Sequence, residues 1–336
     1  MNDLKSILLN YPLEWLLEYD NPSVKYYTLR DILGKADSDA GLQEARREIM
    51  NTGLVPAILA KQNESGYWEM PENFYAAKYK GSVWQLLILA ELGADNTNEK
   101  IKKACEFILD NSQDGKSGGF AHFASAKTGG GRHTEVIPCL TGNMVYSLIK
   151  LGYLNDPRVK RAIEWITSYQ RFDDGIQESL KGWPYDRLKA ACFGKHTCHM
   201  GAVKAMKALS EIPEDQRSAD VKNMIETGAE YMLKHHIFKK SHDLNLVAKP
   251  GWLKLGFPLM YQTDILEILG ILTSLGYRDE RMYEAVDVLV SKQNNNGRFI
   301  LENSFNGRFQ VNIEQKNEPS KWITLNALRV LKKFFA

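Results

Sequence analysis

Apolar and polar positions along this chain follow the helical period almost throughout, and they define two kinds of segment. Segments of the first kind are sharply apolar, with helical patterning that runs nearly all the way round: residues 82–92, 140–151, 198–209, 263–275 and 321–335. Segments of the second kind lie between them and carry one charged face: residues 99–111, 157–170, 221–236 and 281–293. A helix that is apolar all round is buried, whereas an amphipathic helix faces solvent on one side. The pattern therefore predicts helical hairpins, each with one inner and one outer helix.

The N-terminal part of the chain adds helices to this arrangement. The pattern predicts them over residues 4–17, 24–33, 41–50 and 54–61. Residues 24–33 make a sixth inner helix, and no period-two pattern persists long enough to predict a sheet. We therefore expect an all-α fold, a single (α/α)6 toroid domain over residues 1–336. Residues 1–53 are expected to close the ring, and residues 54–336 to form the repeats. The long loops before the inner helices then share one mouth of the ring, where function tends to lie.

A turn motif recurs between the predicted helices. Residues 62–68 read Gln, three polar residues, Gly, any residue and an aromatic, and residues 293–299 repeat this order. Looser copies lie at residues 113–120 and 170–176. The Gln amide is suited to bond backbone groups at a helix end, the Gly permits the turn, and the aromatic packs back onto the helices. A turn that returns along the chain predicts a repeat architecture.

These turns resemble the Gln-Trp repeats of the terpenoid cyclase and protein prenyltransferase α/α-toroid superfamily, from about residue 54 to the C-terminus. Further phrases resemble a prokaryotic, squalene-cyclase-like branch: residues 21–26, 139–143, 256–258 and 319–325. The resemblance implies a toroid that holds an apolar ligand, isoprenoid or peptidyl, in a central cleft. The chain departs from the enzymes of that superfamily, because it lacks the Asp-x-Asp-Asp acid motif of class II terpene cyclases. Asp173 and Asp174 lie in a repeat turn, where a structural Asp-Gly is expected.

Two Cys-x-x-Gly phrases carry the strongest candidate chemistry. Cys139 and Cys198 occupy the same position in consecutive repeats, so both sulfurs are expected near the N-termini of adjacent inner helices. His196 and His199 flank Cys198, and thiolate plus imidazole is a zinc-type ligand set, although the Asp-x-Cys spacing of the prenyltransferases is not reproduced. We therefore predict a zinc site at Cys139, Cys198, His196 and His199. Two alternatives remain open: thiols packed where close helices begin, and a thiol nucleophile paired with His196 or His199, its pKa lowered by the helix N-terminus.

Aromatic residues lie on or just before the inner helices. We predict that they line an apolar ligand cavity, with core packing as the alternative: Trp84, Tyr146, Trp183, Tyr185, Trp252, Tyr261 and Trp322. Aromatic faces also stabilise a cationic group. Asp264 and His199 are the candidate catalytic residues. A carbohydrate-active (α/α)6 enzyme would instead need paired carboxylates at the mouth, for which Glu135, Asp186 and Asp264 are candidates.

Composition and charge limit the classes of partner. The chain has 336 residues, 44% of them hydrophobic, and a net charge of +2, which argues against nucleic acid or an anionic membrane as partner. No apolar run approaches the ~20 residues needed to cross a bilayer. Four cysteines in a chain of this length are no disulfide framework, so we expect the reducing cytoplasm. The leading prediction is a toroid that binds a small apolar ligand or peptide; the other is a non-catalytic repeat scaffold for a protein partner.

Overall fold

The protein is mostly helical, with one two-stranded sheet, in a computed structural model that describes residues 7–174, 180–185, 190–194 and 196–336. The all-α class predicted from the sequence is confirmed, and the helical hairpins are those expected for an α/α toroid. Contacts gather in two compact units. Unit 1 comprises Met1–Ala60, Met232–Leu259 and Thr263–Ala336, and unit 2 comprises Lys61–Tyr231 and Met260–Gln262.

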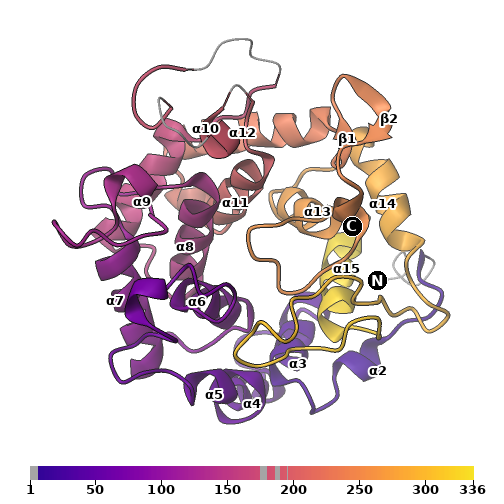
Figure 1. The fold of residues 1–336 in the computed structure, drawn as a ribbon. Helices are drawn as coiled ribbons and strands as arrows, with labels where there is room; N and C mark the ends of the chain where they lie inside the picture. The colour runs from indigo at the N-terminus through magenta and orange to yellow at the C-terminus, as the bar shows by residue number, and fades with distance from the viewer. Residues whose placement is uncertain (1–6, 175–179, 186–189, 195) are drawn as a thin grey trace. The chain divides into compact units, whose positions relative to one another are not determined.

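Unit 2 contains three of the predicted inner helices with their amphipathic partners (Figure 1). Its helices are α6 (Ser82–Glu91), α7 (Glu99–Ser112), α8 (Pro138–Lys150), α9 (Pro157–Tyr169), α10 (Ala190–Phe193), α11 (His199–Ser210) and most of α12 (Ala219–Lys234). Helix α8 packs against α6, α9 and α11. Every residue of α6 from Ser82 to Ala90 is buried, whereas α7 and α9 each bury one face. The division into inner and amphipathic helices therefore holds within this unit.

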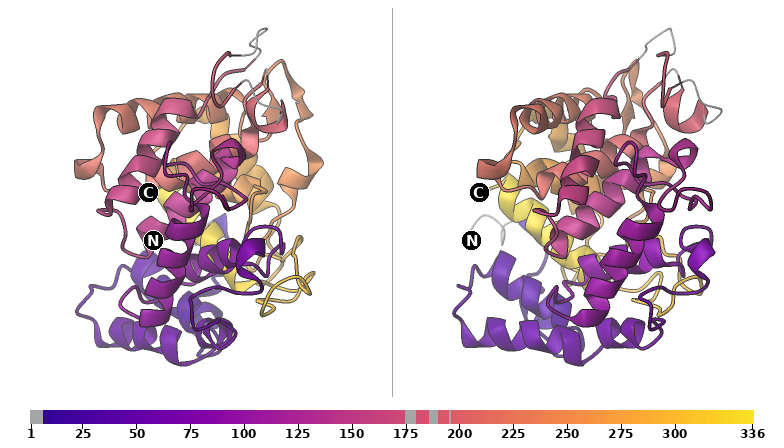
Figure 2. Two further views of the ribbon diagram at one scale, coloured as in Figure 1. Left: turned by 60° about the vertical axis from the view of Figure 1, so that its left-hand side comes forward. Right: turned by 90° about the vertical axis from the view of Figure 1, so that its left-hand side faces the viewer.

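Unit 1 combines the N-terminal helices with the C-terminal hairpins. Its elements are α2 (Leu13–Leu16), α3 (Pro22–Tyr27), α4 (Ala40–Asn51), α5 (Leu54–Leu59), β1 (Lys239–Lys240), β2 (Asp243–Val247), α13 (Ile265–Ser274), α14 (Tyr283–Val290) and α15 (Lys321–Phe334). Helix α15 packs against α13, α3 and α2, and α4 packs against α3 and α5. The indigo helices α3, α4 and α5 stay together in both turned views of Figure 2.

The recurring turns use the same hydrogen bonds. The aromatic residue of each turn donates its backbone N–H to a hydroxyl in the first turn of the helix that follows: Trp68 to Ser82 (3.0 Å), Phe120 to Thr141 (2.9 Å) and Phe299 to Thr324 (3.0 Å). The amides of Gln62 and Gln113 donate to the carbonyls of Lys100 and Arg158, at 2.9 and 2.6 Å. These glutamines therefore tie each turn to the start of the next amphipathic helix. The Gly175 and Ile176 positions of the third copy lie outside the described residues.

Three local predictions were wrong. The helix expected over residues 4–17 is interrupted. Among its described residues, 7–17, helix is found at Ile7 and in the short α2, because Pro12 precedes α2 and proline disfavours helix at the residue before it. Residues 239–247 form an antiparallel hairpin where no sheet was expected, and its strands are too short to show a period-two pattern. Helix α10 lies in a segment expected to be a loop.

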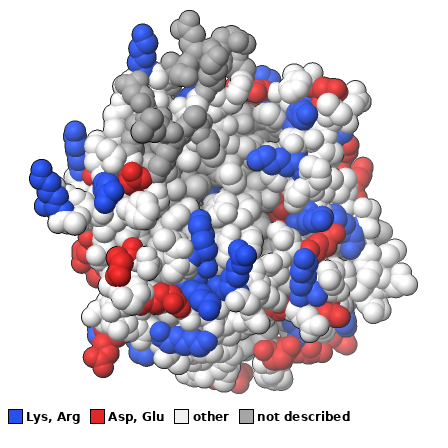
Figure 3. Space-filling model, viewed as in Figure 1, with Lys and Arg blue, Asp and Glu red and all other residues white. Residues whose placement is uncertain are grey.

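The charged residues on the face drawn in Figure 3 are mixed in sign. Lys and Arg side chains and Asp and Glu side chains are both present there among uncharged residues, in keeping with the net charge of +2. Across the described ranges, no helix combines the length and apolar character that crossing a bilayer requires.

Candidate functional site

Helices α8 and α11 approach each other closely at the two glycines of the Cys-x-x-Gly phrases. A Cβ atom on Gly142 would lie 2.4 Å from the carbonyl carbon of Lys204 in α11, and one on Gly201 would lie 2.7 Å from Pro138 Cβ in α8. Each glycine therefore admits the other helix. The shared phrase is explained by this reciprocal packing, which also brings the two helix starts together.

Cys139 is the second residue of α8, and Cys198 immediately precedes α11. Neither thiol forms a disulfide, and Cys139 is buried. Burial, and next to it the charge of Cys198, raises the pKa of the Cys139 thiol to about 12, against the lowering effect of Lys204 and Lys78. The expectation that the helix N-terminus lowers the pKa of this thiol is therefore wrong for Cys139, because loss of hydration outweighs the helix.

Three of the four predicted metal ligands, His196, Cys198 and His199, lie at the start of α11. His196 is exposed before the helix, and His199, its first residue, is half-buried with its ring 6.0 Å from that of Tyr231. Within the described ranges, no three His, Cys, Asp or Glu side chains form a group that would hold a metal ion. Zinc binding by Cys139, Cys198, His196 and His199 stays a prediction of the sequence, as does catalysis by His199.

Three aromatic side chains of unit 2 surround one ammonium group. The Nζ atom of Lys78 lies over the ring of Tyr75 at 4.2 Å, that of Tyr261 at 4.6 Å and that of Trp84 at 5.2 Å. We call Tyr75, Trp84 and Tyr261 the aromatic cage. The centroids of Tyr75 and Trp84 are 5.0 Å apart, and those of Trp84 and Tyr261 are 6.1 Å apart. The structure therefore brings together two predicted ligand residues, Trp84 and Tyr261, and adds Tyr75.

Hydrogen bonds fix the segments that supply the cage. The indole Nε1 of Trp84, in α6, donates to the Tyr75 carbonyl at 3.0 Å. Tyr261 lies in the short segment Met260–Gln262, whose Met260 carbonyl accepts from Asn143 Nδ2 of α8 at 2.9 Å. Gln262 donates to the Tyr79 hydroxyl at 3.3 Å. The cage therefore rests on two buried helices of one unit.

Burial changes the protonation of groups at the cage. It raises the pKa of the Tyr75 hydroxyl, with smaller contributions from Cys139 and Tyr261, and so keeps the phenol neutral. Burial also lowers the pKa of Lys78, against an opposing effect of Cys139. The cage is thus a place where a cation loses hydration and faces aromatic rings.

Two histidine–carboxylate pairs lie in the loop before α8. His122 Nε2 is 3.1 Å from Glu135 Oε2, and the His122 ring is 5.5 Å from Tyr75, beside the cage. His133 Nδ1 is 2.6 Å from Asp114 Oδ2. These pairs were missed from the sequence, because their members are 13 and 19 residues apart and follow no helical spacing.

The Asp114–His133 pair is held between hydrogen bonds and an aromatic face. Burial alone would raise the pKa of Asp114, but hydrogen bonds from His133 and Ser117 hold it below its usual value. The His133 ring stacks on Trp183 at 4.3 Å and 8°. Trp183, predicted to line the cavity, therefore packs on this imidazole.

The other predicted aromatic residues have identified contacts. In unit 2, Tyr146 is buried beneath Lys207 Nζ at 4.4 Å, and the Tyr185 hydroxyl donates to the Tyr169 carbonyl at 2.9 Å. In unit 1, Trp252 is buried, and Trp322 is buried and stacked on Phe257 at 4.4 Å and 9°. Trp322 therefore serves the core of unit 1.

The carboxylates proposed for carbohydrate chemistry are placed differently from one another. Asp264 is buried and caps α13, accepting from the backbone N–H of Glu267 and of Gly256, each at 2.9 Å. Glu135 pairs with His122. Asp186 lies outside the described residues. Both oxygens of Asp264 are thus used to hold the local backbone.

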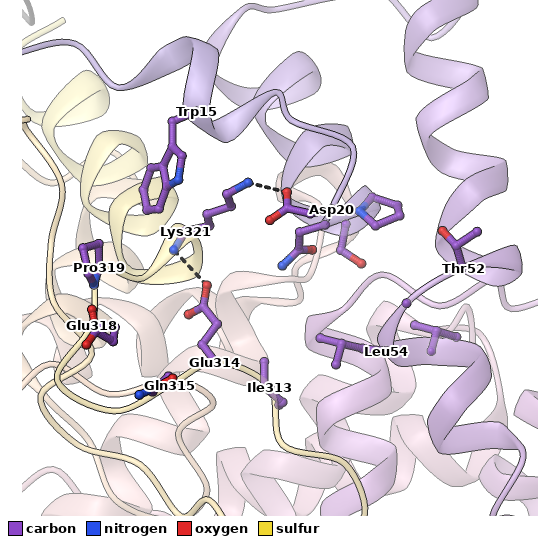
Figure 4. Close-up of a pocket in the computed structure, with 15 residues that line it drawn as sticks. Trp15, Asp20, Thr52, Leu54, Ile313, Glu314, Gln315, Glu318, Pro319 and Lys321 are labelled. Carbon is purple, nitrogen blue, oxygen red and sulfur yellow. Dashed lines mark hydrogen bonds and ion pairs between the residues drawn. The ribbon is translucent and has the colours of Figure 1, made fainter.

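A separate cleft of about 410 Å³ lies in unit 1 (Figure 4). It is lined by the starts of α3, α5 and α15 and by the loop before α15. Glu314 there accepts hydrogen bonds from the Ser320 hydroxyl and from the backbone N–H of Lys321 (2.8 Å) and Trp322 (3.3 Å). Burial raises the pKa of Glu314, although these hydrogen bonds oppose the rise.

Lys321 forms one wall of this cleft. Its side chain is only 7% exposed, and its ammonium is paired with Asp20 and, at 2.8 Å, with Glu18. Figure 4 shows the Glu314 carboxylate and the Lys321 ammonium. Each of these charged groups therefore has partners within unit 1. This cleft was not predicted from the sequence, because its walls come from segments that are far apart along the chain.

No family model and no curated protein matches this chain. Similar solved structures include a protein from Actinoplanes, at 12% identity over 99% of this chain and 100% of that chain, with a TM-score of 0.48. An unsaturated glucuronyl hydrolase specific for heparin is similar at 11% identity over 93% and 84%, with a TM-score of 0.49. The type II terpene cyclase MstE from Scytonema is similar at 13% identity over 98% and 96%, with a TM-score of 0.43.

The hydrolase and the cyclase are both (α/α)6 toroids. At these TM-scores, the likenesses carry no information on the substrate or reaction of this chain.

Proposed function

We propose that unit 2 binds a ligand with an apolar body, isoprenoid or peptidyl, on the aromatic cage of Tyr75, Trp84 and Tyr261. One observation carries this proposal: three ring faces from separate segments are directed at a single point, where the Lys78 ammonium lies. One ring beneath an ammonium, as at Tyr146 and Lys207, would not carry the proposal; here three rings share one ammonium.

Two rings of the cage are accessible to a ligand. Tyr75 and Tyr261 are half-buried, whereas the third ring, Trp84, is buried like Trp68, which fills the core of the same unit. An apolar ligand on such rings gains about 25 cal/mol for each Å² of apolar surface removed from water. Tyr75 and Tyr261 therefore offer ring surface that a ligand would cover.

Fixed supports favour tight binding by the cage. Asn143 holds the Tyr261 segment to α8, and Trp84 holds the Tyr75 carbonyl to α6. A binding surface that is ordered before the ligand arrives loses less conformational entropy on binding. Cys139 and the His122–Glu135 pair adjoin the cage and supply polar groups to its edge.

A titration with farnesol, as an isoprenoid probe, tests the proposal. Tyr261→Ala removes one ring face, and we expect its affinity for farnesol to fall about fivefold or more. Tyr283→Ala is the matched control, because Tyr283 is 54% exposed and belongs to unit 1. Equal affinity of wild type, Tyr261→Ala and Tyr283→Ala would contradict the proposal, as would no binding by the wild type.

A further inference from the structure

The Lys78 ammonium lies at the centre of the cage, and it indicates the kind of ligand group that the cage would bind. A cation attracts an aromatic face out to about 6 Å from the ring centroid. The Lys78 ammonium meets this distance for three rings at once, at 4.2, 4.6 and 5.2 Å. The cage therefore presents three negative ring faces to one positive charge.

No ion pair compensates the charge of Lys78 within the part of the chain that the structure describes. Burial removes water from the Lys78 ammonium in the cage, and this loss of hydration lowers the pKa of Lys78. A primary ammonium is compact and strongly hydrated, and this loss is costly for it. A trimethylammonium group spreads its charge over methyl groups, needs less hydration and contacts more ring surface.

We propose that the aromatic cage binds a trimethylammonium group of the ligand, which takes the place of the Lys78 side chain. This inference rests on the proposed function, because the same rings hold the ligand, and it adds the chemical class of the ligand head. Lys78 is exposed to solvent, so its side chain can move into the solvent when a ligand displaces it from the cage.

The turn that carries Lys78 is anchored independently of that side chain. Val83 donates its backbone N–H to the Phe74 carbonyl at 3.1 Å, and Gln85 Nε2 donates to the Tyr79 carbonyl at 2.7 Å. Rotation of the Lys78 side chain therefore opens the cage without moving Tyr75 or Trp84.

A matched pair of solutes tests the inference. Choline carries the trimethylammonium group, and 3,3-dimethylbutan-1-ol has nearly the same shape without the charge. In calorimetric titrations, Lys78→Ala is expected to bind choline about tenfold more tightly than wild type, and to prefer choline over the neutral alcohol about fivefold or more. Adding Tyr261→Ala to Lys78→Ala should remove most of this affinity.

Lys80→Ala is the control variant, because Lys80 is exposed two residues further along the same turn. It should bind choline like wild type. Equal affinity of Lys78→Ala for choline and the neutral alcohol would overturn the cation site; retained farnesol binding would then leave the proposed function standing. No choline binding by a Lys78→Ala protein that melts like wild type would also overturn it.

A trimethylammonium group occurs on free solutes and on lipid headgroups. Co-sedimentation of Lys78→Ala with phosphatidylcholine vesicles distinguishes these sources. Binding to choline with no vesicle binding would support a small solute, and binding to both would support a lipid headgroup. Vesicle binding that survives Tyr261→Ala in the Lys78→Ala background would contradict recognition by the cage.

Discussion

Gly142 of α8 lies directly against the backbone of Lys204 in α11, with space for a hydrogen atom and for nothing larger. A Cβ atom at Gly142 would lie 2.4 Å from the Lys204 carbonyl carbon and 2.6 Å from its oxygen. The two helices whose starts carry Cys139 and Cys198 are held together at this point. Packing, which the sequence left open beside metal and thiol chemistry, thus explains the glycine of this Cys-x-x-Gly phrase.

Substitution of Gly142 tests this contact. Gly142→Ala forces a methyl group against the Lys204 backbone, so we expect the free energy of unfolding to fall by about 1–3 kcal/mol in chemical denaturation. Gly270→Ala is the matched control, because Gly270 lies inside α13 and its added Cβ meets only Val330 Cγ2, at 3.9 Å. There the gain in helix propensity should raise stability by roughly 0.5–1 kcal/mol. An unchanged or more stable Gly142→Ala protein would contradict the close approach.

Thiol labelling tests the chemistry of Cys139. With a pKa raised to about 12, roughly one Cys139 thiol in a hundred thousand is ionised at pH 7. We therefore expect iodoacetamide to label the half-buried Cys192 and Cys198 before Cys139, as measured by peptide mass spectrometry. Labelling in denaturant, where all four cysteines should react, is the control. Fast labelling of Cys139 in the folded protein would instead support the nucleophile hypothesis.

The raised pKa of Glu314 predicts a pH dependence of stability. The ordinary carboxyl pKa is 4.5, and burial raises it in the folded protein. As pH rises, the unfolded chain releases this proton first, so the contribution of Glu314 to stability is present below pH 4.5 and is lost as pH rises through the folded pKa.

Glu314→Gln removes this titration and keeps an acceptor for the Lys321 N–H. The difference in free energy of unfolding, variant minus wild type, should therefore increase from about pH 4.5 to about pH 7.5. Denaturation curves at both values measure it. A difference that decreases with pH would show that the hydrogen bonds at the start of α15 stabilise the carboxylate more than burial opposes it.

Much of the fold was predictable because each helix carries its own signal. Residues 82–92 and 138–150 are buried on nearly every side, and their apolar runs show this directly. The turns were predictable because a Gln and an aromatic residue at fixed spacing meet the same partners, as Trp68 meets Ser82. The interruption before the short α2 was missed, because residues 4–17 form one apolar run although Pro12 lies within it.

The candidate site was predictable only in part. Trp84 and Tyr261 were named because they lie near predicted inner helices, but Tyr75 and Lys78 come from a turn without helical period. Tyr75 and Tyr261 are far apart along the chain, so the sequence does not show that both rings contact one ammonium. The burial that raises the pKa of Cys139 was likewise not predictable from the sequence, because it depends on which segments cover the start of α8.

Native mass spectrometry tests the ligand site most directly, on protein purified from cells without detergent or a metal-affinity tag. The account predicts that wild type and Tyr283→Ala carry a bound small molecule, and that Tyr261→Ala, with one ring of the cage removed, carries much less of it. The same bound mass in equal amount on wild type and Tyr261→Ala, or none on wild type, would contradict a ligand site at Tyr75, Trp84 and Tyr261.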